Sequence, residues 1–340
     1  MARISAVLCM SHSPFLYVGP EEWGPAAAAR RANGGISADT PVDAPEENAA
    51  KHARCTAAFA VLAGKLAEAK PDVLLIFGDD QLEQFDFQNF PALALFVGER
   101  FEGYRISPFF GLPVNRERAR RPKSPEHWAS VAGHPALARR LMVGLMERGF
   151  DLAFSTEVAK ERGVGHAFMR PLEKLRPEGD LPVIPFSINC YYGPQPTARR
   201  CRQVGRAVRE IIDGLDDDLS VAVIGSGGLW HTPNEPHAYL DGGFDADILG
   251  ALRKGDTARM AEVLDMRAPP FDPGDPEAVR RISAGTDMVL GLGNGSGETR
   301  NWIAAAATVD GVPGTVVDYV PINASPIGAG FAYWDLGRKT

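Results

Sequence analysis

Short apolar runs alternate with longer amphipathic stretches along most of the chain, and this alternation limits the possible folds more than any other feature. The short runs have the continuous apolar character of strands that are buried on both faces of a sheet. They are Ile4–Met10, Val73–Phe77, Leu93–Val97, Leu152–Phe154, Val183–Ile188, Leu219–Ile224 and Thr315–Val320. Stretches with apolar residues at helical spacing lie between them. These stretches are Glu46–Ala69, Pro135–Arg148, Ala198–Leu215, Ala246–Leu252, Thr257–Leu264, Pro276–Leu290 and Glu298–Ala307. We therefore predict an α/β fold in which helices flank both faces of a mostly buried central sheet.

The chain contains no internal repeat and no low-complexity tract, so we predict a single domain over residues 1–340. Two segments interrupt the alternation. Residues 19–46 are polar and rich in glycine and proline, which predicts a disordered stretch or a surface flap. Residues 101–130 are irregular and rich in arginine and proline, and the segment is long enough to serve as a lid over a site.

Composition excludes several classes of protein. The net charge of −7 argues against a general nucleic-acid-binding surface. There is no run of about 18 apolar residues, so we expect no membrane span. The cysteines Cys9, Cys55, Cys190 and Cys201 form no C-x-x-C pair, which is typical of buried thiols in a reducing compartment. Met1–Met10 is too short for a signal peptide. We expect a cytoplasmic protein.

Metal-capable side chains lie at the edges of apolar runs at three distant places. His12 follows the run that ends at Met10, His231 follows Gly227-Gly228 after another strand-like run, and Glu298 opens a helix-like run. In a parallel sheet the carboxyl ends of the strands meet at one edge, where ligands bind. Imidazoles and a carboxylate gathered there can form a non-heme iron centre with open coordination positions.

Two of these residues, His12 and Glu298, also have a simpler interpretation. His12 can be a core or capping histidine, and Glu298 can be an acidic residue favoured by the helix dipole at a helix N-terminus. His166 follows Gly163-Val164-Gly165, and these glycines would let a ligand approach the backbone closely. His231 lies in a tight turn in which a histidine can meet a substrate. The spacing of the residues does not identify a reaction.

Taken together, the motifs resemble those of a known family. They are Ser11-His12-Ser13-Pro14, Gly133-His134-Pro135-Ala136-Leu137-Ala138, Gly165-His166, Ile184-Pro185-Phe186, Arg200-Cys201, Gly225-Ser226-Gly227-Gly228-Leu229-Trp230-His231 and Ser296-Gly297-Glu298 with Trp302. In this order they resemble the class III extradiol dioxygenases, within them the catalytic subunit of protocatechuate 4,5-dioxygenase, and more closely the methylgallate and gallate dioxygenase branch. The resemblance runs from about Ile4 to Trp334.

The resemblance implies an Fe(II) enzyme that opens the ring of a catechol-type aromatic with O₂. It implies that His12 and Glu298 are iron ligands, that His231 is the catalytic acid and base, and that His166 is a second pocket histidine. One position departs from the pattern. The family usually ends a strand in Asp-His, with the histidine as a metal ligand, whereas this chain has Gln81 there. An amide oxygen is a poorer ligand for Fe(II) than an imidazole.

Three solutions remain open for that position. His52 lies near the start of the predicted helix Glu46–Ala69. If this helix runs antiparallel to the next strand, Val73–Phe77, its N-terminus lies near the end of that strand. His52 would then lie beside Gln81 and supply the missing nitrogen, with Gln81 hydrogen-bonding behind it. Alternatively, Gln81 itself is the ligand, or the position is degenerate and unoccupied.

The resemblance also suggests residues for substrate recognition. Asn323, Ser325, Tyr191 and Tyr192 are candidates for binding an acidic catechol such as gallate or 3-O-methylgallate; the simpler interpretation is that they are solvated loop residues. A homodimer is the default assembly. Two other functions remain possible: a non-redox metal-dependent hydrolase on the same scaffold, and a metal-free, catalytically silent relative that acts as a binding subunit.

Overall fold

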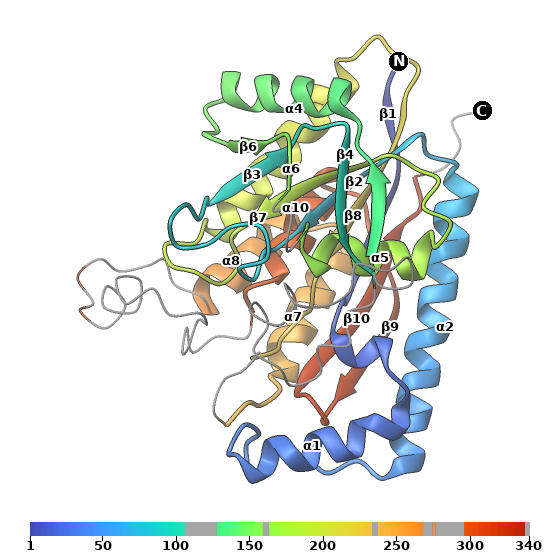
Figure 1. Ribbon diagram of the computed structural model, residues 1–340, viewed down its shortest axis with the longest axis vertical. Helices are drawn as coiled ribbons and strands as arrows, with labels where there is room; N and C mark the ends of the chain where they lie inside the picture. Colours follow the sequence, from blue (N-terminus) through green and yellow to red (C-terminus); the bar gives the residue numbers. More distant parts are fainter. Residues whose placement is uncertain are drawn as a thin grey trace.

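The computed structural model describes residues 1–105, 128–158, 163–232, 237–267 and 296–336, together with Gly274 and Pro276. Its main sheet has the strand order β6-β3-β7-β2-β8-β1-β10-β9 (Figure 1). These strands are β1 (Arg3–Met10), β2 (Val73–Gly78), β3 (Leu93–Phe96), β6 (Ala153–Ser155), β7 (Val183–Ile188), β8 (Ser220–Ser226), β9 (Thr315–Ile322) and β10 (Ile327–Trp334). A small second sheet pairs β4 (Arg100–Tyr104) with β5 (Trp128–Ala132).

The four central strands, β7, β2, β8 and β1, run parallel to one another. Their carboxyl ends therefore meet at one edge of the sheet. The flanking strands are mixed, since β3 is antiparallel to β7 and β10 is antiparallel to both β1 and β9. Residues that directly follow the four parallel strands are thus brought together although they are far apart in the sequence.

Helices cover both faces of the sheet, as predicted. They are α1 (Trp23–Ala32), α2 (Pro45–Ala69), α4 (Pro135–Glu147), α5 (His166–Leu175), α6 (Ala198–Asp213), α7 (Gly242–Arg253), α8 (Thr257–Arg267) and α10 (Thr299–Ala307), with 3₁₀ turns η1 (Pro14–Tyr17) and η2 (Pro20–Glu22). In β1, Val7 and Cys9 pack into a core with α4, α6, α7, α8 and α10, whereas Leu8 and Met10 pack into a second core with α1, α2 and α5. Burial on both faces explains the apolar character of the strands.

Several elements differ from the sequence-based prediction. Within 19–46 the chain forms η2 and α1 rather than an irregular flap. The run Ala26–Ala29 favours a helix, and the buried Trp23 anchors it by donating its indole N–H to the carbonyl of Phe15 at 2.9 Å. The strand β10 was not predicted, because its glycines weaken the strand pattern. The helix α5 was also missed; it is short and contains Pro171.

Two predictions fall largely outside the described residues. β4 and β5 occupy the two ends of the segment 101–130, where an irregular chain was expected. Residues 106–127 lie outside the described ranges, so the lid remains a prediction. The same holds for the helix expected at Pro276–Leu290, apart from Pro276. Among the helices of the described ranges, none has both the length and the apolar character required to cross a bilayer.

Candidate active site

His12 lies two residues beyond Met10, the last residue of β1. Its Nδ1 is 2.9 Å from Oγ of Ser226, the last residue of the neighbouring strand β8. This contact orients the ring so that Nε2 points toward Glu298, with 3.3 Å between Nε2 and Oε2. Nε2 is buried and has no hydrogen-bond partner. A buried nitrogen of this kind is suited to bind a metal ion.

Glu298 is the N-cap residue of α10, and only 1% of its surface is exposed. The backbone N–H of Gly228 donates to its Oε2 at 2.5 Å, and its Oε1 is 3.2 Å from Nε2 of His231. A Cβ atom at Gly227 would lie 2.8 Å from the Cβ of Glu298, so this glycine allows the carboxylate to approach the turn. Burial alone would raise the pKa of Glu298, but His231 and His12 hold it well below its usual range.

Asp79, directly after β2, is a functional candidate that the sequence analysis did not select. It is fully buried, its Oδ1 lies 3.8 Å from Nε2 of His12, and the side-chain amide of Asn301 donates to it at 3.4 Å. Burial raises its pKa well above the usual range, and the neighbouring Glu298 and Glu83 carboxylates raise it further. Its place at the end of a buried parallel strand was a signal that could have identified it.

His166 is the first residue of α5. Its Nδ1 is 2.8 Å from Oε1 of Glu83, and its backbone N–H donates to the same oxygen at 2.9 Å. Burial lowers the pKa of the ring to about 3. A neutral ring whose Nδ1–H faces a carboxylate has an unprotonated Nε2.

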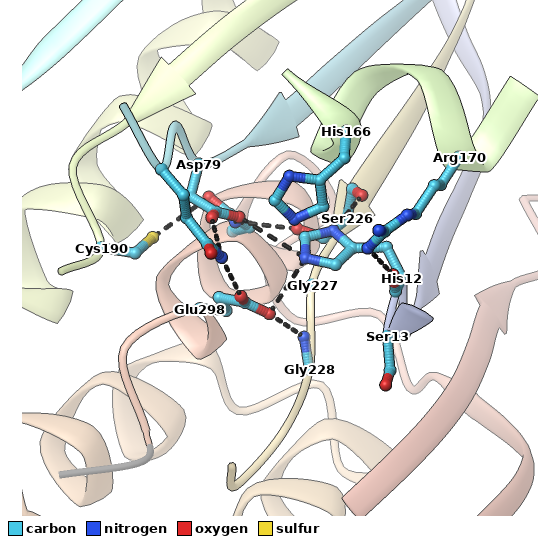
Figure 2. Close-up of polar contacts among 12 residues, drawn as sticks. His12, Ser13, Asp79, His166, Arg170, Cys190, Ser226, Gly227, Gly228 and Glu298 are labelled. Atoms are coloured by element: carbon cyan, nitrogen blue, oxygen red, sulfur yellow. Dashed lines mark hydrogen bonds and ion pairs between the residues drawn. The ribbon is translucent and has the colours of Figure 1, made fainter. Parts of the chain in front are cut away.

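His166 and His12 are edge to face, with 4.7 Å between ring centroids. His12, Asp79 and His166 each offer a ligand atom, and these atoms lie within 4.8 Å of one another. Figure 2 shows these three side chains and Glu298 pointing toward one another. Asp79, Glu83 and Glu298 are each at most 1% exposed, and such crowded buried carboxylates need a compensating cation. The donor set therefore fits a divalent metal ion.

His231 and His12 contact different carboxylate oxygens of Glu298, Oε1 and Oε2 respectively. Nε2 of His231 is 3.0 Å from the hydroxyl of Tyr191, which also donates a hydrogen bond to Oε1 of Glu298. Nδ1 of the same ring is 3.3 Å from the carbonyl of Leu229. Burial opposes protonation of the ring, yet Glu298 raises its pKa above the ordinary value. A histidine held in this way can accept and return a proton.

Gln81 borders the cluster, and its contacts are those of a hydrogen-bond donor. Its side-chain N–H₂ donates to Oδ2 of Asp79 at 3.2 Å and to Oε1 of Glu298 at 3.4 Å. Gln81 thus ties together two carboxylates that come from different elements.

His52 is not brought to the cluster. Its ring packs edge to face against Trp23, with 5.8 Å between centroids. α2 packs against β9, β10 and β1, and in the sheet β8 lies between β1 and β2. The helix therefore covers strands to one side of β2, and the expected proximity of His52 to Gln81 is not observed.

Of the four predicted substrate residues, Tyr191 contacts the cluster. Asn323 donates its side-chain amide to Oδ1 of Asp43 at 2.8 Å, and Oγ of Ser325 accepts from Arg30 at 2.7 Å. The ring of Tyr192 packs against Phe87 and Phe90, with centroids 5.2 and 4.5 Å apart. Asn323 and Ser325 lie in the turn between β9 and β10, and that hairpin approaches the site because Ile327 forms a β-bridge with His231.

The family model for the catalytic LigB subunit of aromatic ring-opening dioxygenase matches residues 6–320. The chain belongs to this family. The membership confirms the resemblance inferred from the strand-end motifs. It also agrees with the structure, in which the matched region contains the whole cluster around His12 and Glu298.

Named relatives of this LigB-family chain include three dioxygenases. Gallate dioxygenase of Pseudomonas putida is 31% identical over 144 residues, which are 41% of each chain. The 2,3-dihydroxyphenylpropionate/2,3-dihydroxicinnamic acid 1,2-dioxygenase of Photorhabdus laumondii is 31% identical over 193 residues, covering 56% of this chain and 52% of the relative. The enzyme of the same name from Rhodococcus globerulus is 28% identical over 328 residues, covering 88% and 87%. The chain thus spans about half of the first two relatives.

Proposed function

We propose that this protein is a non-heme Fe(II) extradiol dioxygenase that opens the ring of a catechol-type substrate with O₂. One observation carries the proposal. The buried, unpaired Nε2 of His12 faces Glu298, and the same carboxylate contacts His231, which is in turn hydrogen-bonded to Tyr191. A metal-binding pair thus lies next to a proton-transfer pair, as the chemistry of a catechol requires. Membership of the LigB family supports this assignment.

His12 and Glu298 would hold the iron. When bound, Fe(II) supplies open positions for the substrate and O₂ and lowers the pKa of the substrate hydroxyls. Within the protein, Nε2 of His231 is the atom that accepts the substrate proton and later returns it, while the carbonyl of Leu229 holds Nδ1. The hydroxyl of Tyr191 contacts Nε2 and would help to fix the direction of the ring.

We further propose that the substrate carries a carboxylate, as gallate and 3-O-methylgallate do. Ser325 accepts a hydrogen bond from the guanidinium of the half-buried Arg30, and the hairpin that carries Ser325 bridges to His231 through Ile327. A carboxylate that binds beside Ser325 would meet a cation and form charge-assisted hydrogen bonds. The name of the gallate dioxygenase relative supports the same substrate class.

The test is metal analysis of protein purified without air, followed by oxygen-electrode traces with gallate, 3-O-methylgallate and catechol. We expect stoichiometric iron, oxygen uptake with the acids, and recovery of activity after chelation with Fe(II) but not with Zn(II). Equal activity with zinc would identify a non-redox metalloenzyme instead. Absence of metal binding would indicate a catalytically silent relative.

A further inference from the structure

We propose that Asp79 and His166 are metal ligands and complete, with His12 and Glu298, a centre of two imidazoles and two carboxylates. They take the place of the imidazole that Gln81 does not provide. The inference rests on the proposed function for the identity of the metal, but the ligand set can be tested with any divalent ion. It also gives His166 a role different from that of the second pocket histidine that the resemblance implies.

The distances suit one bound ion. From Nε2 of His12, Oε2 of Glu298 is 3.3 Å away and Oδ1 of Asp79 is 3.8 Å away. The ligand atoms of His12, Asp79 and His166 all lie within 4.8 Å of one another. Ligands at about 2.1 Å from a metal are about 3 Å apart when adjacent and about 4.2 Å apart when opposite. The ligand atoms of His12, Asp79 and His166 therefore lie close enough to share one ion after small side-chain movements, and Glu298 adjoins them at His12.

His166 is oriented as metal-binding histidines are. Its Nδ1 and backbone N–H both contact Oε1 of Glu83, which leaves Nε2 for the metal. A carboxylate on the second ring nitrogen fixes the tautomer and makes the ligating nitrogen more basic. A Cβ atom at Gly165 would lie 2.5 Å from Oε2 of Glu83, so the glycine before His166 is what allows this contact.

Gln81 then supports the ligands by hydrogen bonds and does not bind the metal itself. Its N–H₂ donates to both Asp79 and Glu298, and an amide N–H₂ offers no lone pair to a metal. It can hold the two carboxylates in position while each keeps its other oxygen for the ion. Two carboxylates balance the charge of one divalent ion, so the bound centre is neutral, which favours its burial.

The test measures binding of Co(II) or Fe(II) to the chelated full-length protein without substrate and without O₂. Asp79→Asn and His166→Gln should each weaken affinity by roughly 10²-fold or more. The matched control His52→Gln should bind as tightly as wild type. Circular dichroism of the metal-free variants shows whether they are folded.

A second measurement does not depend on the folding of the Asp79 or His166 variants. Pulsed EPR of the nitrosyl complex of the wild-type iron protein should show two coordinated histidine nitrogens, and His52→Gln should show the same two. The inference is overturned if one nitrogen is found, if His52→Gln loses one, or if Asp79→Asn keeps wild-type affinity. If the ligand set holds but no catechol is cleaved, the proposed function fails and this inference stands.

Discussion

Asp245 accepts a hydrogen bond from the backbone N–H of Trp230 at 2.7 Å and so holds the residue that precedes His231. Its other oxygen accepts from the hydroxyl of Tyr319, also at 2.7 Å. Asp245 is fully buried in the first turn of α7. The turn that carries His231 is therefore tied through one carboxyl group to a helix and to β9.

The first prediction follows from this anchor. Asp245→Ala should lower kcat about tenfold, because loss of the hydrogen bond lets the His231 turn shift. KM and iron content should stay close to those of wild type. Asp245→Asn keeps an acceptor for the Trp230 N–H and should retain most of the activity. Steady-state kinetics and metal analysis of both variants test this; equal losses in the two would contradict the positioning role.

A second prediction concerns pH. Burial raises the pKa of Asp245 to about 6, although the hydrogen bonds from Tyr319 and Trp230 lower it. In the unfolded chain a carboxyl titrates near ~3.9. The folded state therefore binds this proton more tightly, and the resulting stability is fully present below ~4 and is lost as pH rises through the folded pKa.

Asp245→Asn lacks this titration. Between about pH 4 and pH 7.5, its free energy of unfolding should therefore rise by roughly 1–3 kcal/mol relative to wild type. Urea unfolding of both chelated proteins at the two pH values measures the difference. A gap that does not change with pH would show that Asp245 titrates as it does in the unfolded chain.

The third prediction separates proton transfer from iron binding. His231→Ala should lower kcat by roughly 10²-fold or more while iron stays bound. Tyr191→Phe removes the hydroxyl that contacts both His231 and Glu298, and a smaller loss of about tenfold is expected. Kinetics paired with iron analysis check both. Loss of iron from His231→Ala would make His231 a ligand.

The fourth prediction tests the Arg30–Ser325 pair. Arg30→Gln and Ser325→Ala should each raise KM for gallate-type acids about tenfold, because a charge-assisted contact to the substrate carboxylate is lost. For unsubstituted catechol, KM should change little, which provides the internal control. If KM rises equally for both substrates, the pair stabilises the hairpin and does not bind the substrate carboxylate.

The sequence alone was sufficient to predict the strands and helices whose patterns are local. Val73–Phe77 and Val183–Ile188 are continuous apolar runs because burial on both sheet faces requires it, and α6 follows from helical spacing alone. β10 was missed, since its glycines carry little strand signal and its place is set by pairing with β1 and β9. Pairing between distant segments leaves no local pattern.

For the site, the sequence determined that His12, His231 and Glu298 would meet, because each lies in a segment adjoining the edge of a parallel sheet. Only the tertiary structure decided which other residues lie beside them. Asp79 faces His12, whereas Gln81, two residues on, donates to the carboxylates. His52 lies on α2, which packs against β9, β10 and β1, to one side of β2. Side-chain direction after a strand and the choice of strands that a helix covers depend on packing in three dimensions. Spacing along the chain does not encode them.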